Sequence, residues 1–128
     1  MKKTLYFLAV MVFLIFTSVC FAATVEEQFK EFENKAAQGD ANAQYNLGSA
    51  YAQGNYGEPK DIAKAIEWYE KAGLQGHTRA LNLLGNMYYF GIDVPQDMNK
   101  AKEWYKLACD KDYTQSCEKY DEIIKRGY

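Results

Sequence analysis

The chain has 128 residues, which allows one domain or a short array of repeats. Its composition, 48% hydrophobic and 25% charged, is ordinary for a globular protein and excludes a disordered or low-complexity chain. The formal net charge of −2 excludes the basic surface that nucleic-acid-binding domains carry, so no nucleic-acid partner is expected.

Residues 1–22 have the pattern of a secretory signal peptide. Two lysines precede an apolar run from Leu5 to Phe16, and small residues follow the run. This pattern predicts cleavage after Ala22. The mature chain would then comprise residues 23–128 and be located in the periplasm or outside the cell.

Two other interpretations of this segment stay open. Residues 5–23 contain no charge, so an uncleaved segment would be long enough to anchor the chain in a membrane. A lipoprotein requires a small residue just before Cys20, and Val19 stands there instead. We favour cleavage because the apolar core is short, and we therefore expect no membrane contact once the signal is removed.

A first helix is predicted over residues 24–38. Thr24 and Glu27 have the spacing of a capping box, in which two residues satisfy each other's backbone amides at the start of a helix. Three residues that follow fall on one side of this helix and are expected to face inward: Phe29, Phe32 and Ala36.

The next part of the chain contains two copies of one unit, residues 39–75 and 76–112. Residues 59–69 match residues 95–105 at an offset of 36, with seven identities in eleven positions. Self-similarity at this period is typical of helical repeat arrays, in which each unit packs only against its neighbours.

Each unit is predicted to form two antiparallel helices. Residues 43–51 recur 37 positions later at 80–88, and in both copies the apolar residues share one helical face. Gly54 ends the first helix, and an extended approach leads to the second. Asp61 and Asp97 are suited to cap the second helix of their units.

A glycine recurs inside the first helix of both units, at Gly48 and Gly85. A glycine in the middle of a helix costs about 1 kcal/mol relative to alanine. Because both units retain it, we expect another helix to approach so closely there that any side chain would clash.

A last helix is predicted from Tyr113 to Arg126, within a capping segment of residues 113–128. Tyr120 and Asp121 stand where the repeats have a Leu-Gly pair, which suits the end of an array. The expected inward residues are Tyr120, Ile123 and Ile124. The fold class is therefore predicted to be all-α. We expect an α/α superhelical solenoid of antiparallel helix pairs, with about six helices after the signal peptide.

At these residues the chain resembles the Sel1-like repeat (SLR) family, which is related to tetratricopeptide repeats. The resemblance covers about residues 35–117 and rests on residues 39–48 and 64–72, with parts of both motifs repeated at 84–88 and 100–105. It implies an α/α solenoid that makes protein–protein contacts and is often found in bacterial envelopes.

Cleavage would leave two cysteines, Cys109 and Cys117, and an even number in an exported chain favours a disulfide. The segment is also similar to a bacterial cysteine-rich secreted subset of the family, the Hcp type, in which cysteines eight positions apart tie neighbouring helices. That subset has one pair in each repeat, whereas this chain has one pair in all. A redox dithiol is disfavoured because such pairs are usually Cys-x-x-Cys. A zinc site is disfavoured because only His77 could join the two cysteines.

A second candidate chemistry is that of penicillin-recognising enzymes. Ser116 and Lys119 have the Ser-x-x-Lys spacing, in which a lysine one helical turn away activates the serine. Some relatives of the cysteine-rich subset carry a β-lactamase label, so a weak β-lactam-binding or β-lactamase-type enzyme is kept as the alternative. The sequence lacks the accompanying Ser-Asp-Asn and Lys-Thr-Gly elements.

His77 is interpreted as a solvated turn residue.

The candidate binding surface is the inner, concave side of the first helix in each pair, by analogy with tetratricopeptide grooves. Amide and tyrosine side chains at helical spacing suit an extended peptide or a loop, although solvated or inter-repeat positions would have the same pattern. The predicted protein-binding residues are Asn42, Tyr45, Asn46, Ser49, Gln53, Arg79, Asn82, Asn86, Tyr89 and Phe90.

The main prediction is an exported, non-catalytic repeat protein that binds a protein or peptide in the bacterial envelope, as an adaptor, regulator or immunity protein. No catalytic residues, cofactor or metal are expected. The protein is expected to be a monomer or to associate weakly end to end.

Overall fold

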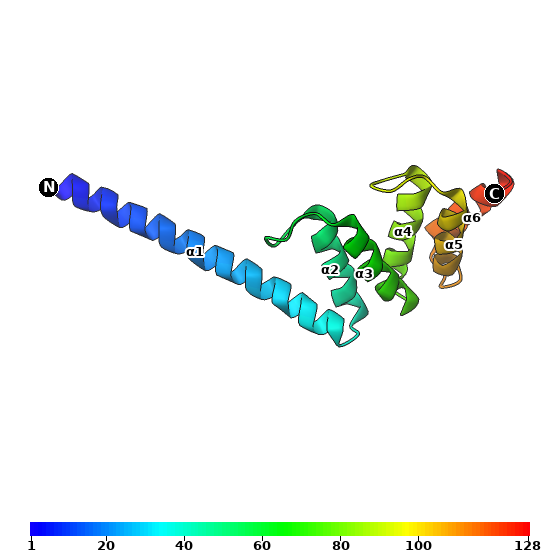
Figure 1. Cartoon of the computed structure of the whole chain (residues 1–128), viewed down its shortest axis with the longest axis horizontal. Helices are drawn as coiled ribbons and strands as arrows, with labels where there is room; N and C mark the ends of the chain where they lie inside the picture. Colours follow the sequence, from blue (N-terminus) through cyan, green and yellow to red (C-terminus); the bar gives the residue numbers. More distant parts are fainter.

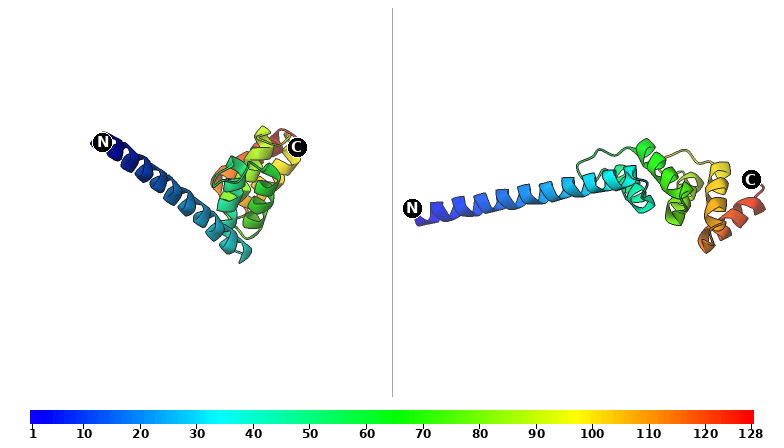
Figure 2. Two further views of the ribbon diagram at one scale, coloured as in Figure 1. Left: turned by 60° about the vertical axis from the view of Figure 1, so that its left-hand side comes forward. Right: turned by 90° about the horizontal axis from the view of Figure 1, so that it is seen from below.

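The computed structural model describes the backbone of residues 1–128 and the side chains of all of them except residues 19–23. The described backbone forms six helices and no strand. Figure 1 shows the last five of them stacked in chain order while the first projects from the stack, and Figure 2 shows the same arrangement from two further directions. The all-α solenoid is thus confirmed. The helices are α1 (Lys2–Ala37), α2 (Ala41–Gln53), α3 (Ile62–Leu74), α4 (Thr78–Phe90), α5 (Met98–Cys109) and α6 (Thr114–Lys125).

The first helix differs from the prediction. Helix α1 begins at Lys2 and runs without interruption through Thr24, so the expected helix start at residue 24 is wrong for the uncleaved chain. A capping box satisfies the free backbone amides at the start of a helix. Thr24 lies inside α1, so the predicted capping box does not mark a helix start in this chain. The predicted cleavage position, after Ala22, lies within residues 19–23, whose side chains are outside the described part of the structure. Over the residues that were described, no helix combines the length and apolar character needed to cross a bilayer.

Each helix packs on the next one along the chain. Helices α2 and α4 end at Gly54 and Gly91, which both adopt the left-handed conformation with φ 68°. Asp61 and Asp97 cap α3 and α5 by accepting backbone N–H groups of the first turn, as predicted. Local capping therefore sets the limits of the repeated helices.

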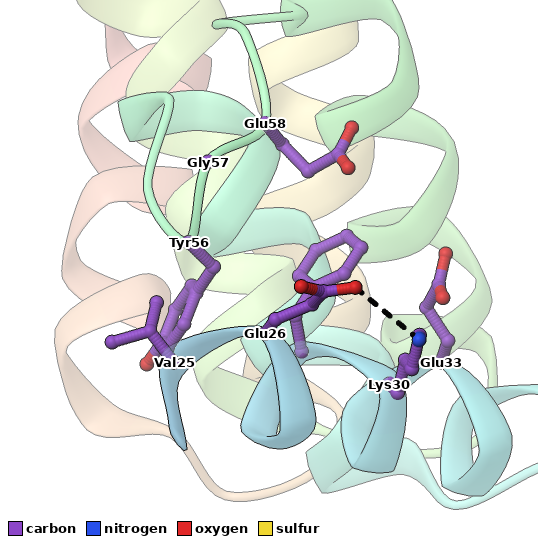
Figure 3. Close-up of a pocket in the computed structure, with 8 residues that line it drawn as sticks. Val25, Glu26, Lys30, Glu33, Tyr56, Gly57 and Glu58 are labelled. Atoms are coloured by element: carbon purple, nitrogen blue, oxygen red, sulfur yellow. Dashed lines mark ion pairs between the residues drawn. The ribbon is translucent and has the colours of Figure 1, made fainter. Parts of the chain in front are cut away.

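Helix α1 is held to the array by aromatic contacts with α2 and the loop that follows it. The Phe29 ring meets the Tyr51 ring edge-on at 5.8 Å, and the Phe32 ring meets the Tyr56 ring edge-on at 5.7 Å. Figure 3 shows Tyr56 reaching down from this loop toward α1. Phe29 and Ala36 are buried and Phe32 is half-buried, so the inward side of residues 24–37 is as predicted.

A tyrosine lying on a glycine joins the two helices of each repeat. A Cβ atom added at Gly48 would lie 2.7 Å from Cδ1 of Tyr69, and one added at Gly85 would lie 2.6 Å from Cδ1 of Tyr105. Both tyrosines are buried. The close approach predicted from the recurring glycines is confirmed, since no side chain larger than hydrogen fits beneath either ring.

Each of these tyrosines also donates a hydrogen bond to the residue that follows its glycine. The Tyr69 hydroxyl donates to Oγ of Ser49 at 3.2 Å, and the Tyr105 hydroxyl donates to Oδ1 of Asn86 at 2.6 Å. Burial, which disfavours the phenolate, raises the pKa of Tyr105. The neutral hydroxyl is thus kept as a donor, and it sets the rotation of the two helices about their contact.

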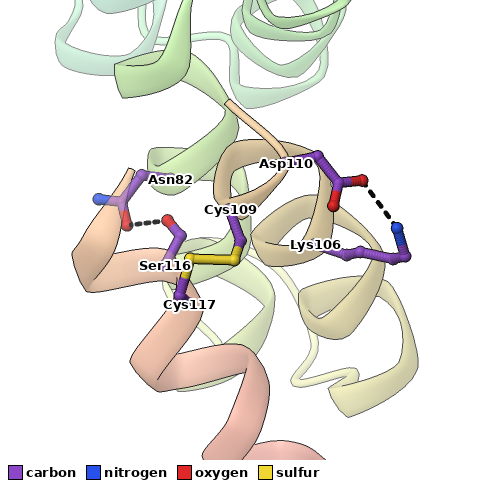
Figure 4. The surroundings of a disulfide bond; sticks show 6 residues. All are labelled: Asn82, Lys106, Cys109, Asp110, Ser116 and Cys117. Carbon is purple, nitrogen blue, oxygen red and sulfur yellow. Dashed lines mark hydrogen bonds and ion pairs between the residues drawn. A yellow bond between two sulfur atoms is a disulfide. The ribbon is translucent and has the colours of Figure 1, made fainter. Parts of the chain in front are cut away.

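The same pair of positions, eight residues apart in the sequence, forms a contact at each of three successive junctions in the array. Different residues occupy this pair at each junction. At the first junction Nε2 of Gln44 donates to the carbonyl oxygen of Ala36 at 3.1 Å. At the second, Leu81 packs against Gly73, where a Cβ atom would lie 2.6 Å from its Cδ2. At the third, the predicted disulfide joins Cys109 and Cys117, with their Cα atoms 4.7 Å apart (Figure 4). The disulfide therefore stands at the positions where the second junction has the packing contact between Leu81 and Gly73.

Helix α6 is the last helix of the array. Ile123 is fully buried and Tyr120 is half-buried, as predicted, but Ile124 is 46% exposed and the prediction that it faces inward is wrong. In the repeats, a second helix covers the position equivalent to Ile124. Among the described residues, no such helix covers Ile124, which is therefore exposed.

Glu122 attaches α6 to the preceding repeat. Its carboxylate accepts the Tyr89 hydroxyl at 2.7 Å and pairs with Lys119 at 2.8 Å and with Arg126. The hydrogen bond from Lys119, followed by that from Tyr89, holds the pKa of this carboxyl below its ordinary value. Local sequence does not reveal this role of Glu122, because Tyr89 is 33 residues away from it.

We expect Gly85→Ala to destabilise the protein. The new methyl group would overlap the buried Tyr105 ring, and overpacking of this kind costs about 1–3 kcal/mol even though alanine favours a helix. Urea unfolding followed by circular dichroism measures the change. Asn46→Ala, at an exposed position of α2, is the control and should be neutral or slightly stabilising. Equal stability of the Gly85→Ala variant and the wild type would contradict the close contact.

We also expect the contribution of Glu122 to the stability of the folded protein to depend on pH. Its pKa is depressed in the folded state, so the stabilisation is present above the unfolded-state pKa and is lost as the pH falls through the folded-state pKa. The difference in Tm between wild type and Glu122→Gln should be largest at neutral pH and shrink in acid. Glu118→Gln, at an exposed position of the same helix, is the control. A difference that is constant from pH 7 to pH 3 would refute this role.

Candidate protein-interaction surface

The candidate surface is the side of the first helix in each repeat, α2 and α4, that was predicted as the concave binding side, and we call it the A-helix surface. The structure divides the ten residues predicted to form it into an exposed group and a packed group. The exposed members are Asn42, Asn46, Gln53, Arg79 and Phe90.

Three polar members of the packed group hold the repeats together. Ser49 and Asn86 accept the tyrosine hydroxyls described above. Oδ1 of Asn82 accepts the hydroxyl of Ser116 on α6 at 3.0 Å (Figure 4). All three are half-buried. Their side chains therefore already have partners within the chain. Ser49 and Asn86 are bonded within their own repeats, and Asn82 is bonded to the helix that follows its repeat.

Two tyrosines of the predicted set also pack within the chain. Tyr89 is only 6% exposed and lies among Tyr105, Phe90 and Glu122. Tyr45 stacks on the His77 ring, with centroids 4.6 Å apart and planes 18° apart. Helical periodicity placed both on the predicted binding side, but contacts within the chain cover them.

His77 is a cap of helix α4, so its interpretation as a solvated turn residue is wrong. Its Nδ1 accepts the backbone N–H of Ala80 at 3.2 Å, in the place where Asp61 and Asp97 cap other helices. Burial lowers the pKa of His77, which favours the neutral ring that can accept a hydrogen bond. The equivalent residue of the first repeat, Asp40, caps α2 in the same way and could have suggested this role.

Four of the five exposed residues of the A-helix surface border two hollows. Asn42 and Arg79 line one of about 390 Å³, together with His77 at the start of α4. Asn46 and Gln53 line another of about 210 Å³, which is closed on its other side by residues of α1 and the α2–α3 loop, among them Phe32 and Tyr56. Four exposed residues of the predicted binding set therefore border hollows, and Tyr56, which was not among the predicted residues, borders one of them as well.

The opposite side of the array has a different character. The second helices of the repeats, α3 and α5, carry charged side chains outward: Lys64, Glu67, Lys71, Lys100, Glu103 and Lys106. The exposed amides of α2 are neutral and cost less to desolvate than these charges. Because charged residues are depleted at the centre of protein interfaces, the A-helix surface is the better candidate for binding.

The structure does not assemble the serine-based site considered as an alternative. Ser116 is completely buried and its hydroxyl donates to Asn82. Lys119 pairs with Glu122, and this hydrogen bond raises the pKa of Lys119, which favours the protonated form that cannot accept a proton. Neither the access nor the Ser–Lys contact that acylation requires is therefore present. Among the described residues, no three His, Cys, Asp or Glu side chains are grouped to hold a metal ion.

Comparison with known sequences finds the same repeat in other proteins. The Sel1 repeat model matches residues 41–77 and 78–113. A component of an ERAD-associated E3 ubiquitin-protein ligase, HRD3A of Arabidopsis thaliana, is 39% identical over 66 residues, which are 52% of this chain and 10% of HRD3A. The secretory immunoglobulin A-binding protein EsiB of Escherichia coli O6:H1 is 40% identical over 72 residues, which are 56% of this chain and 14% of EsiB. The chain thus spans only a small part of these relatives.

Solved structures share the fold. The c5321 protective antigen of uropathogenic Escherichia coli, which has an SLR fold, superposes with a TM-score of 0.69 and 33% identity over 80% of this chain and 22% of the antigen. A Sel1 repeat protein from Oxalobacter formigenes superposes with a TM-score of 0.62 and 32% identity over 71% of this chain and 36% of that protein.

These matches agree with the geometry described above. Sel1 repeat proteins mediate protein–protein interactions, and the family is generally non-catalytic and adaptor-like. The two matched units cover more than half of the residues, and each contains one helix pair joined by a tyrosine on a glycine. The chain therefore belongs to the Sel1 repeat family.

Proposed function

We propose that this protein is an exported, non-catalytic module that binds a protein or peptide through the A-helix surface in the bacterial envelope. The observation that carries the proposal is the groove lined by Asn46 and Gln53 of α2 and by Phe32 and Tyr56 beside it. Exposed amides supply donors and acceptors to a peptide backbone, and the aromatic rings supply apolar area.

Three further observations support the proposal. The relative EsiB is named for binding secretory immunoglobulin A, which is a protein ligand. The Cys109–Cys117 disulfide suits an oxidising compartment, which agrees with the signal-like pattern of residues 1–22. The buried Ser116 and the ion-paired Lys119 favour a binding role over hydrolysis of a β-lactam.

The exposed members of the surface provide the test. The test variant carries four substitutions, Asn42→Ala, Asn46→Ala, Gln53→Ala and Phe90→Ala. It removes exposed side chains and leaves the contacts of the buried tyrosines with Gly48 and Gly85 unchanged, so it should fold. When the 128-residue chain is expressed as bait in a bacterium with an outer membrane, we expect wild type in the periplasmic fraction with a captured protein. Capture should fall at least about tenfold in the variant, because truncating a few central contacts typically costs more than 1 kcal/mol.

The matched control changes four exposed residues on the outer side of the second helices: Glu67→Ala, Leu74→Ala, Glu103→Ala and Leu107→Ala. It should capture the same protein as the wild type. Equal capture by the A-helix variant, or loss of capture only in the control, would contradict the proposal. Absence of the bait from the periplasm would contradict export.

A further inference from the structure

A larger hollow, of about 620 Å³, lies between helix α1 and the α2–α3 loop. Its apolar part is formed by Val25, Phe29 and Tyr56, with the Phe29 and Tyr56 ring centroids 6.3 Å apart. Figure 3 shows Glu26 and Glu33 rising from α1 and Glu58 reaching over from the loop toward the same space. The hollow thus combines aromatic surface with a rim of carboxylates.

The rim has an excess of negative charge. Three glutamates line the hollow with one cation, Lys30, which pairs with Glu26 at 3.3 Å. Among the described residues, no ion pair engages Glu33 or Glu58. The two carboxylates also act on the neighbouring Tyr51, whose pKa is raised first by burial and then by Glu58 and Glu33.

In the second repeat, the loop at the equivalent position is built differently. Tyr56 corresponds to Asp93, and both adopt φ 59°. Asp93 pairs with Lys60 at 2.7 Å, and the following residue, Val94, packs against the core. The first loop has one more residue before its proline, at Gly57–Glu58. The loop that lines the hollow therefore differs in length and in its contacts from the equivalent loop of the second repeat.

The hollow continues the A-helix surface. Tyr56 lines both the 620 Å³ hollow and the 210 Å³ hollow that contains Asn46 and Gln53. Phe29 and Phe32, one helical turn apart on α1, both lie against this tyrosine, with ring centroids 6.3 Å and 5.7 Å from its own. A peptide segment lying along α2 would therefore reach the acidic rim at Tyr56.

We propose that this hollow binds a lysine or arginine side chain of the partner, next to an apolar residue in an extended segment. The inference rests on the proposed function and specifies the chemistry of the peptide. The positive group meets the carboxylates of Glu33 and Glu58, and the side-chain stem and the apolar neighbour cover Phe29 and Tyr56. A cation beside aromatic rings gains further attraction from their faces.

The test uses two blocked tetrapeptides, acetyl-Gly-Arg-Leu-Gly-amide and acetyl-Gly-Glu-Leu-Gly-amide, titrated into isotopically labelled protein expressed from the full chain. We expect the arginine peptide to shift the backbone amide signals of Val25, Tyr56, Gly57 and Glu58, and the glutamate peptide to shift them at most slightly. The double variant Glu33→Gln and Glu58→Gln should bind the arginine peptide about fivefold more weakly, because each exposed charge contact contributes about 0.5 kcal/mol.

The control variant Glu67→Gln and Glu103→Gln changes net charge equally but lies outside the hollow, and it should bind as wild type does. Equal shifts with both peptides, unchanged binding by the Glu33/Glu58 variant, or shifts located elsewhere would overturn the inference. Shifts that appear on concentrating the protein alone would assign the hollow to a second copy and also overturn it. Because no captured partner is used, this failure is distinct from failure of the proposed function.

Discussion

The contact of a tyrosine ring with a helical glycine determines the geometry of each repeat. Tyr69 on Gly48 and Tyr105 on Gly85 bring two helices within a distance that no other residue permits. The hydroxyl of each ring then fixes the rotation of the helices by bonding to Ser49 or Asn86. The third equivalent glycine position is occupied by Asp121, which is exposed on α6. Asp121 has a side chain where the repeats have only hydrogen, so the contact of a tyrosine ring with a glycine cannot form at this position.

Functional variation is added where this repeated geometry does not constrain the chain. The junction between repeats tolerates a glutamine, an apolar pair or a disulfide at equivalent positions. The loop between α2 and α3 tolerates an extra residue, which carries Glu58 away from the core and leaves the acidic hollow. The outward side of the first helices is also free to vary, because the tyrosines and glycines lie on the opposite side. A rigid frame with variable edges is what a binding module requires.

The sequence predicted the parts of the fold that depend on local pattern. The repeat period, the caps at Asp61 and Asp97 and the close approach at Gly48 and Gly85 all follow from residues within one unit. The errors concern contacts between units: Tyr89 and Tyr45 are covered by a neighbouring helix, and Ile124 is not. Asn82 is bonded to Ser116, 34 residues away. Such pairings depend on the rotation of each helix relative to its neighbours, which the periodicity of apolar residues in the sequence does not reveal. The exposed part of the candidate site was therefore predictable, whereas its boundary with α1 was not.

The central claim is that the side of the array formed by α2 and α4 is the side that binds. Hydrogen–deuterium exchange of the chain with and without its captured partner measures this directly, because backbone amides covered by a partner exchange more slowly. Bound partner should slow exchange in the loop of residues 54–61 and at the ends of α2 and α4 next to it, and leave the outer amides of α3 and α5 unchanged. Slower exchange confined to α3 and α5 would contradict the account.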